Sequence, residues 1–330
     1  MRFYAQHAAA LKREVAATIP PDVLRDLHRK RPLRHALLTL RVFGLLAIAM
    51  VVLIHGAPLW LWLPAALVAG FCIFDGTVLL HEVVHNAVFH DDRPDGHRWL
   101  GYLYSIPSGI SAAQFTKWHL DHHEELGSDE LDPKRHRLSP KVNRRWYKLL
   151  YFSPALFFLY FRAARQETAG YPAALQKTIA RERSIAILFH LSVMAAIGLL
   201  AGSHALLRAY IVPVFFVFPV AFAINRLGQH YDIDPNEVAE WSTLMKPSWV
   251  WDFAFLNSNY HLEHHYFPRV PFYNLPRLAR ALAPFYAARG MQTHTFGELL
   301  WKYLILNYQP HTDWDHPAAP MSRPAAVSGD

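Results

Sequence analysis

Residues 257–268 read Asn-Ser-Asn-Tyr-His-Leu-Glu-His-His-Tyr-Phe-Pro and contain three histidines at positions i, i+3 and i+4. On a helix this spacing places His261, His264 and His265 on one face, which is typical of a metal-binding array and not of a packing pattern. A single histidine on an apolar face is usually a core residue with a hydrogen-bond partner. The interpretation of this stretch therefore depends on the rest of the chain.

Two further histidine motifs support a metal site. The sequence His-Leu-Asp-His-His repeats the same spacing at His119, His122 and His123, and His-Glu-Val-Val-His places His81 and His85 at i and i+4. Neutral imidazole is the commonest side-chain metal ligand in proteins. Three motifs with eight histidines predict a metal centre.

The apolar residues are concentrated in four long stretches, each about the length that crosses a hydrocarbon core of roughly 30 Å. They cover residues 36–54, 57–80, 185–202 and 205–224. The connections at 55–56 and 203–204 are very short, so we expect two hairpins. The predicted fold is an all-α integral membrane protein with four transmembrane helices and a cytoplasmic helical cap that holds the histidines.

Composition excludes other classes of protein. The 330 residues carry a net charge of +7, but the basic residues flank the apolar stretches. This placement is typical of cytoplasmic loops that contact anionic lipid headgroups, and not of a nucleic-acid-binding surface. The single cysteine, Cys72, lies within the second stretch, so the chain can form neither an internal disulfide nor a cysteine-ligated cluster.

The division of the chain follows from these stretches. Residues 1–35 are polar and basic, so we expect a cytoplasmic N-terminal segment without a signal peptide. Residues 36–308 form the predicted catalytic domain, and residues 309–330 a disordered tail. All histidine motifs then lie on one side of the membrane. The charged run 124–145 is interpreted as a solvated surface, or as a docking surface for a redox partner.

The motif at residues 81–85 also matches H-E-x-x-H, in which two histidines hold zinc and the glutamate acts as a base. A membrane metalloprotease would leave six histidines without a role, since zinc takes four ligands. Eight or nine nitrogen ligands instead suit two octahedral transition-metal ions with positions open for dioxygen, and iron is the metal that reacts with dioxygen in such a site. His230, after the fourth stretch, is the candidate for a ninth ligand. Metal transport or storage is a further alternative.

Residues 36–280 resemble the membrane fatty acid desaturase superfamily, whose pattern is H-x-x-x-H followed by two H-x-x-H-H motifs. Residues 81–86 and 101–127 look like sphingolipid desaturases, whereas residues 259–271 look like bacterial acyl-lipid desaturases. The resemblance implies two iron ions held by the eight motif histidines, and it implies His230 as a further ligand. The implied ligand set is His81, His85, His119, His122, His123, His230, His261, His264 and His265.

The resemblance also implies the reaction. Such enzymes use dioxygen and external electrons to desaturate the hydrocarbon chain of a lipid, fatty acyl or sphingoid, and related hydroxylases and ketolases use near-identical motifs. The chain has no nucleotide or haem motif, so we expect a separate electron donor, a ferredoxin or a small haem protein. Asp121, Glu82 and Glu263 are candidates to orient ligand imidazoles. We expect a bacterial inner-membrane protein with its active site on the cytoplasmic side.

Overall fold

The computed structural model of the chain describes residues 3–90, 94–128, 130–234 and 237–311. Within these ranges every regular element is a helix, and the only strand-like pairing is an isolated bridge between Met245 and His294. The prediction of an all-α fold is confirmed for this part of the chain.

Four helical stretches are long and apolar enough to cross a membrane, as the sequence predicts, and they make the chain a multi-pass membrane protein. All four are longer than expected, and the largest differences are in the third, which begins at Ala173 instead of residue 185, and the fourth, which ends at His230 instead of residue 224. The four are α3 (Pro32–Ile54), α4 (Leu59–Val84), α9 (Ala173–Ala201), and the continuous run of α10 (Ser203–Leu206), the π-helical η3 (Leu207–Val217) and α11 (Phe218–His230).

Large apolar side chains cover the outside of these helices. Leu40 and Ile48 of α3 and Leu199 and Leu200 of α9 are all more than 60% exposed. Exposed apolar surface of this extent is unusual for a protein in water, and a bilayer would cover it with lipid chains.

The most enclosed of the long helices is α4, which packs against α3, η3 and α11. At Gly70 a Cβ atom would lie 2.4 Å from the Cβ of Val217 in η3. The two backbones can approach this closely only because residue 70 has no side chain. This contact fixes α4, whose last turn carries the first histidine motif.

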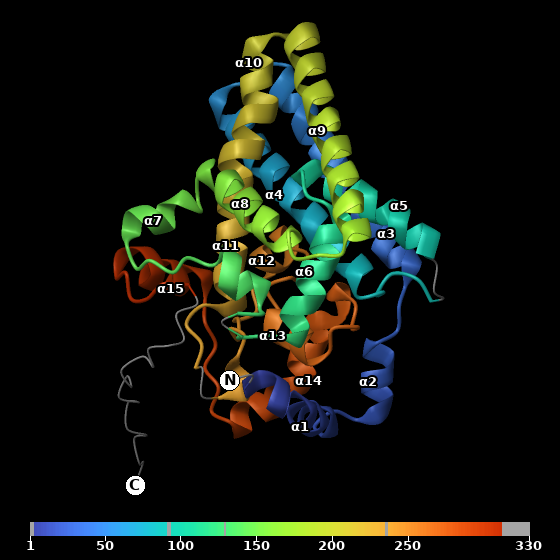
Figure 1. Cartoon of the computed structure of the whole chain (residues 1–330), viewed down its shortest axis with the longest axis vertical. Helices are drawn as coiled ribbons and strands as arrows, with labels where there is room; N and C mark the ends of the chain where they lie inside the picture. Colours follow the sequence, from blue (N-terminus) through green and yellow to red (C-terminus); the bar gives the residue numbers. More distant parts are fainter. Residues whose placement is uncertain (1–2, 91–93, 129, 235–236, 312–330) are drawn as a thin grey trace.

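The α9–α10 turn marks one end of the long helices. The remaining helices lie around and beyond the opposite end (Figure 1). Most of them are short, and none of the described ones is a candidate span. They are α1 (Phe3–Ala17), α2 (Pro21–Leu27), α5 (Pro94–Ser105), η1 (Ile106–Ser108), α6 (Ala112–Glu124), η2 (Lys134–Leu138), α7 (Arg145–Leu150), α8 (Ala155–Thr168), η4 (Val238–Glu240), α12 (Trp249–Ala254), α13 (His261–Tyr266), η5 (Phe272–Asn274), α14 (Leu275–Ala288), α15 (Phe296–Leu300) and η6 (Trp301–Ile305).

The N-terminal segment is tied to the region after the third histidine motif. Asn274 donates a hydrogen bond from Nδ2 to the carbonyl oxygen of Leu27 at 2.8 Å, and Arg289 forms an ion pair with Glu14 at 2.8 Å. These contacts join α1 and α2 to η5 and α14. The described part of the N-terminal segment is therefore packed against the region that follows the third histidine motif.

Most of the tail expected at residues 309–330 lies outside the described residues. Its described part includes His311, which is buried, with Nε2 at 2.9 Å from the carbonyl oxygen of Arg226. The chain is thus still packed against α11 at residue 311.

Candidate metal centre

The nine histidines singled out in the sequence lie in two clusters. Within each cluster, one nitrogen of every side chain lies within 4.8 Å of the corresponding nitrogen of every other. The clusters touch, since the ring centroids of His123 and His265 are 4.4 Å apart. Cluster A contains His81, His85, His119, His123 and His264, and cluster B contains His122, His230, His261 and His265.

Each H-x-x-H-H motif contributes to both clusters. On α6, His119 and His123 belong to cluster A and His122 to cluster B, and α13 divides its histidines in the opposite sense. Successive residues of an α-helix lie about 100° apart, so adjacent histidines point to different places, whereas residues i and i+4 overlap. Spacing alone predicts that the three imidazoles of a motif form one array. In the structure they are instead divided between the two clusters.

The other histidines come from the ends of the long helices. His81 lies in the last turn of α4 and His85 directly follows that helix, and His230 is the last residue of α11. Both long helices thus stop where they reach the clusters. His230, the ninth candidate, lies in cluster B between His122 and His261, with Nε2 at 3.0 Å and 3.1 Å from theirs.

The spacing of the nitrogens fits octahedral coordination. In cluster A, His119 Nε2 lies 2.8 Å from His85 Nε2 and 2.9 Å from His123 Nε2, and in cluster B the His261–His265 distance is 3.1 Å. Nitrogens about 2.1 Å from one ion are about 3.0 Å apart at octahedral angles and about 3.4 Å apart at tetrahedral angles. The observed distances match the octahedral value.

Burial keeps these imidazoles in the form that binds metal. Desolvation lowers the pKa of His85 to about 3 and that of His122 to about 4, and it lowers the pKa of His119 and His264 well below the ordinary value. A neutral imidazole has a lone pair to donate, whereas a protonated one does not. The clusters are therefore sets of neutral nitrogen donors at neutral pH.

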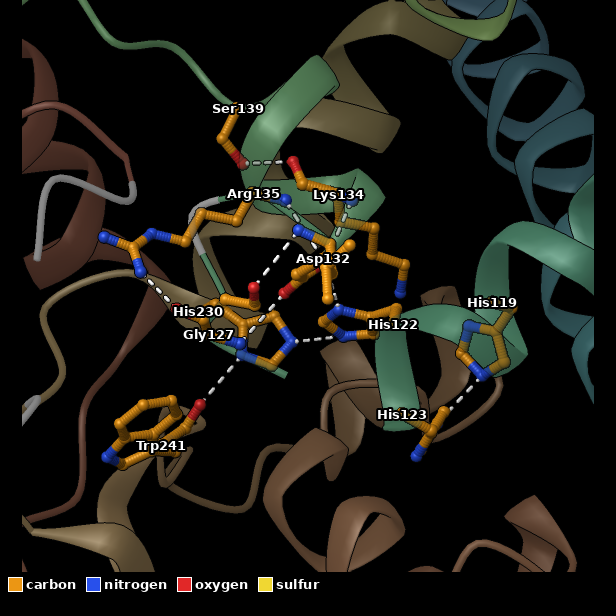
Figure 2. A network of polar contacts seen from close by, with 12 residues as sticks. His119, His122, His123, Gly127, Asp132, Lys134, Arg135, Ser139, His230 and Trp241 are labelled. Carbon is orange, nitrogen blue, oxygen red and sulfur yellow. Dashed lines mark hydrogen bonds and ion pairs between the residues drawn. The ribbon is translucent and has the colours of Figure 1, made fainter. Parts of the chain in front are cut away.

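Asp132 orients a histidine of cluster B, a role that the sequence did not predict. Its Oδ1 lies 2.9 Å from Nδ1 of His122 and accepts the backbone N–H of Lys134 at 3.0 Å, while Oδ2 accepts the N–H of Gly127 at 3.1 Å (Figure 2). Burial raises the pKa of Asp132, but His122 and these backbone donors outweigh that effect, and the pKa is lower than usual. An ionised Asp132 fixes the proton of His122 on Nδ1 and leaves Nε2 free for a metal.

The charged run 124–145 is thus not simply a solvated surface, which corrects that interpretation. Asp132 is 1% exposed and Arg135 is 5% exposed. Arg135 donates a hydrogen bond to the carbonyl oxygen of Gly127, in the loop that surrounds Asp132. No spacing rule distinguishes Asp132 from the other acids of this run, because its partner is ten residues away and the loop between them has no periodic pattern.

A backbone carbonyl orients His230 in the same way as Asp132 orients His122. Nδ1 of His230 lies 2.9 Å from the carbonyl oxygen of Trp241 (Figure 2). The imidazole N–H donates to this oxygen, so Nε2 again faces the cluster as an acceptor.

The three carboxylates expected to orient imidazoles differ in their surroundings. Asp121 is partly exposed on α6 and pairs with Lys117 at 2.5 Å. Glu263 is buried, which raises its pKa to about 7, and it accepts a hydrogen bond from the hydroxyl of Tyr286 at 2.9 Å. Of these three, only Glu82 lies beside an imidazole of a cluster, with Oε1 at 3.8 Å from Nδ1 of His81.

The geometry also bears on the zinc protease alternative. Oε2 of Glu82 accepts the backbone N–H of Phe272 at 3.0 Å, so this carboxylate holds the third-motif segment against α4. His81 and His85 lie together with three more histidines instead of standing as a pair. The H-E-x-x-H match is thus part of a larger nitrogen-rich site.

Comparisons with known proteins give a consistent result. Residues 57–297 match the family model described as fatty acid desaturase. The chain is 31% identical over 310 residues to sphingolipid delta(4)-desaturase/C4-monooxygenase DES2 of Homo sapiens, covering 89% of this chain and 87% of that protein.

Two other relatives have related names. The Bos taurus protein named sphingolipid delta(4)-desaturase/C4-monooxygenase DES2 is 29% identical over 254 residues, covering 74% of this chain and 73% of its own. Sphingolipid delta(4)-desaturase DES1 of Gallus gallus is 28% identical over 240 residues, covering 69% and 68% respectively.

Proposed function

The chain belongs to the fatty acid desaturase family and is an oxidoreductase, and on this premise we propose that it is a di-iron enzyme that introduces a double bond into the hydrocarbon chain of a sphingolipid. The observation that carries the proposal is the pair of neutral histidine clusters at octahedral spacing. In the reaction, one dioxygen, two electrons and two protons convert a CH2–CH2 unit into CH=CH with release of two waters.

Each cluster would hold one iron ion: cluster A through five histidines and cluster B through four. When bound, the two ions would supply the oxidising power, with dioxygen and external electrons, to remove hydrogen from an unactivated C–H bond. The protein contributes the ligand geometry. Asp132 and the Trp241 carbonyl hold two imidazoles of cluster B in the required tautomer, and Glu82 lies beside His81 of cluster A.

A cavity beside the clusters would receive the reacting part of the lipid. Its walls include His81, His119, His261 and His264, and it has about 880 Å³ of space, part of it open to the outside. Phe74, Phe115, Trp118, Tyr160, Phe222 and Phe272 give it an aromatic wall that would exclude water from that side.

The choice of a sphingolipid as substrate rests on the names of the relatives. The third motif resembles that of acyl-lipid desaturases, so a fatty acyl chain is the alternative substrate. Hydroxylation is the second candidate reaction, because two of the relatives are named both desaturase and C4-monooxygenase. A hydroxylation would use one dioxygen, two electrons and two protons to convert C–H to C–OH with release of one water.

The topology and the electron source are also proposals. The two turns at residues 55–58 and 202–203 would face away from the cytoplasm, and the helices around the clusters would form a cytoplasmic cap on a domain covering residues 36–308. A ferredoxin or a small haem protein would deliver electrons to this cap. The human, bovine and chicken relatives are animal proteins, so the bacterial inner membrane stays a prediction.

The test is expression of the full chain in a lipid-producing host, followed by mass spectrometry of the lipids. A desaturase lowers the mass of a sphingolipid by two hydrogens, and a hydroxylase raises it by one oxygen. His264→Ala should abolish either product, whereas Ser184→Ala, an exposed change on α9, should not. Unchanged host lipids in cells that contain folded, iron-loaded protein would contradict the proposal.

A further inference from the structure

Two cationic side chains line the cavity beside the histidine clusters. They are Lys134, the first residue of η2, and Arg226 of α11, and histidines of both clusters line the same cavity. Figure 2 shows the Lys134 side chain extending from η2 toward His122. The candidate metal ligands and the two cations therefore face one shared space.

One loop holds both cations in place. Arg226 donates from Nη2 to the hydroxyl oxygen of Ser139 at 2.9 Å, and this hydroxyl donates to the carbonyl oxygen of Lys134 at 2.9 Å. On its other side, the backbone N–H of Lys134 donates to Asp132, the carboxylate that orients His122. The backbone of Lys134 is thus bonded in both directions, which fixes where its side chain begins.

The charge of Lys134 acts on both clusters. Burial is the main cause of the low pKa of His119 in cluster A and of His261 in cluster B, and the Lys134 ammonium lowers both pKa values further. Because the interaction between two charges weakens with distance, the ammonium must lie near both clusters at once. An anion bound to Lys134 would therefore also lie near both.

The two cations lack a counter-charge on their side of the cavity. Within the described residues, neither Lys134 nor Arg226 forms an ion pair, and the Lys134 ammonium donates no hydrogen bond. The only acid among the described residues that line the cavity is Glu82, which lies beside His81. Burial and the charge of Arg226 lower the pKa of Lys134 to about 7, which shows how poorly its charge is compensated.

Bound iron would increase this excess of positive charge. The nine candidate ligands are neutral imidazoles, so they offset none of the four charges of two ferrous ions. Asp132 and Glu82, the carboxylates beside cluster imidazoles, can offset two of these charges at most. A buried charge is costly unless an opposite charge compensates it. An anion from outside the chain would supply the missing negative charge.

From these observations we propose that Lys134 and Arg226 form a binding site for a small inorganic anion, such as chloride, in the cavity that faces both histidine clusters. The inference goes beyond the proposed function and rests on its di-iron centre. The ammonium of Lys134 would donate a charge-assisted hydrogen bond to the anion, and Arg226 would add a second positive charge. The carboxylate of an anionic lipid has the same chemistry and is the competing ligand.

The test uses azide, an anion that gives an absorption band when it binds ferric iron. The full-length protein, loaded with iron and oxidised by air, is titrated with azide in detergent without added lipid. Lys134→Met should weaken azide binding by roughly 10- to 100-fold, the effect of losing one charge-assisted hydrogen bond. Lys134→Arg keeps the charge and should restore most of the affinity. The matched control is Lys177→Met, an exposed change on α9.

Two further readouts separate an anion site from a structural role. Iron content should be equal in all these proteins, and uncharged nitric oxide should bind the ferrous wild type and the ferrous Lys134→Met variant equally well. Chloride should displace azide from the wild type. Displacement by a fatty acid carboxylate but not by chloride would assign the site to a lipid and overturn the inference.

A measurement on the wild type decides the question if Lys134→Met does not fold. Crystals of the iron-loaded protein grown in bromide should show bromide beside Lys134 by anomalous scattering. Absence of bromide there, equal azide affinity in the wild type and Lys134→Met, or an equal loss of nitric oxide binding would overturn the inference while the proposed function stands. If the histidine clusters bind no iron, no azide band forms and the proposed function itself fails.

Discussion

At the scale of single residues, the decisive contact is that of Asp132 with His122. The carboxylate is buried, and it bonds to an imidazole and to the backbone of its own loop. Its role is to set the tautomer and direction of the His122 imidazole, which a charge count along the sequence does not detect.

Replacing this carboxylate should weaken the metal centre. We expect Asp132→Ala to lower iron occupancy or activity by roughly 10- to 100-fold, as for other residues that orient ligand histidines. The matched control is Asp121→Asn, because Asp121 forms a partly exposed pair with Lys117 on the same helix, and such a pair contributes little. Iron per chain and product formation are measured for both. Equal losses in the two variants would show that the contact with His122 has no special role.

Glu82 separates the di-iron account from the zinc protease account. A glutamine can still accept the backbone N–H of Phe272, so Glu82→Gln should keep the segment in place and lower the rate by at most roughly 100-fold. A hydrolase that lost its base would stop almost completely while keeping its metal. The measurements are the oxidation rate and hydrolytic activity without dioxygen. Hydrolysis that Glu82→Gln removes and zinc restores would support the protease.

At the scale of helices, the long apolar stretches could be predicted because a run of about twenty predominantly apolar residues is typical of a membrane span. The extension of α9 back to Ala173 could not be predicted in this way. Its first turns contain charged residues such as Lys177, Arg181 and Glu182, and a hydropathy pattern identifies only the apolar part of a helix. The histidine motifs were also predictable, but their division between two clusters needed the relative placement of α4, α6, α11 and α13.

The contact between α4 and η3 should be sensitive to a single methyl group. Gly70→Ala would place a Cβ atom 2.4 Å from Val217, and relieving such a clash typically costs about 1–3 kcal/mol. In α3, Gly44→Ala is the control, because a Cβ atom there has no neighbour within 4 Å. Thermal unfolding of the purified proteins should show a lower midpoint for Gly70→Ala only. A midpoint equal to that of the control would mean that the two helices are not packed this closely.

At the scale of the whole molecule, the proposed arrangement of four spans in two hairpins would place both histidine clusters on one side of the membrane. Single cysteines introduced in a Cys72→Ala background test this arrangement. We expect a membrane-impermeant thiol reagent to label His204→Cys from outside the cell, and Trp146→Cys only after the membrane is opened. Both original residues are exposed, so the new thiols will be accessible. Labelling of Trp146→Cys in intact cells would reverse the proposed topology.

The central claim is that two iron ions occupy two separate histidine clusters. The most direct measurement is the metal content of the purified full-length protein, together with variants that remove one ligand from each cluster. We predict two iron ions per chain for the wild type, and iron loss with loss of lipid oxidation for both His264→Ala in cluster A and His230→Ala in cluster B. One zinc ion per chain, or full iron and full activity in His230→Ala, would contradict the account.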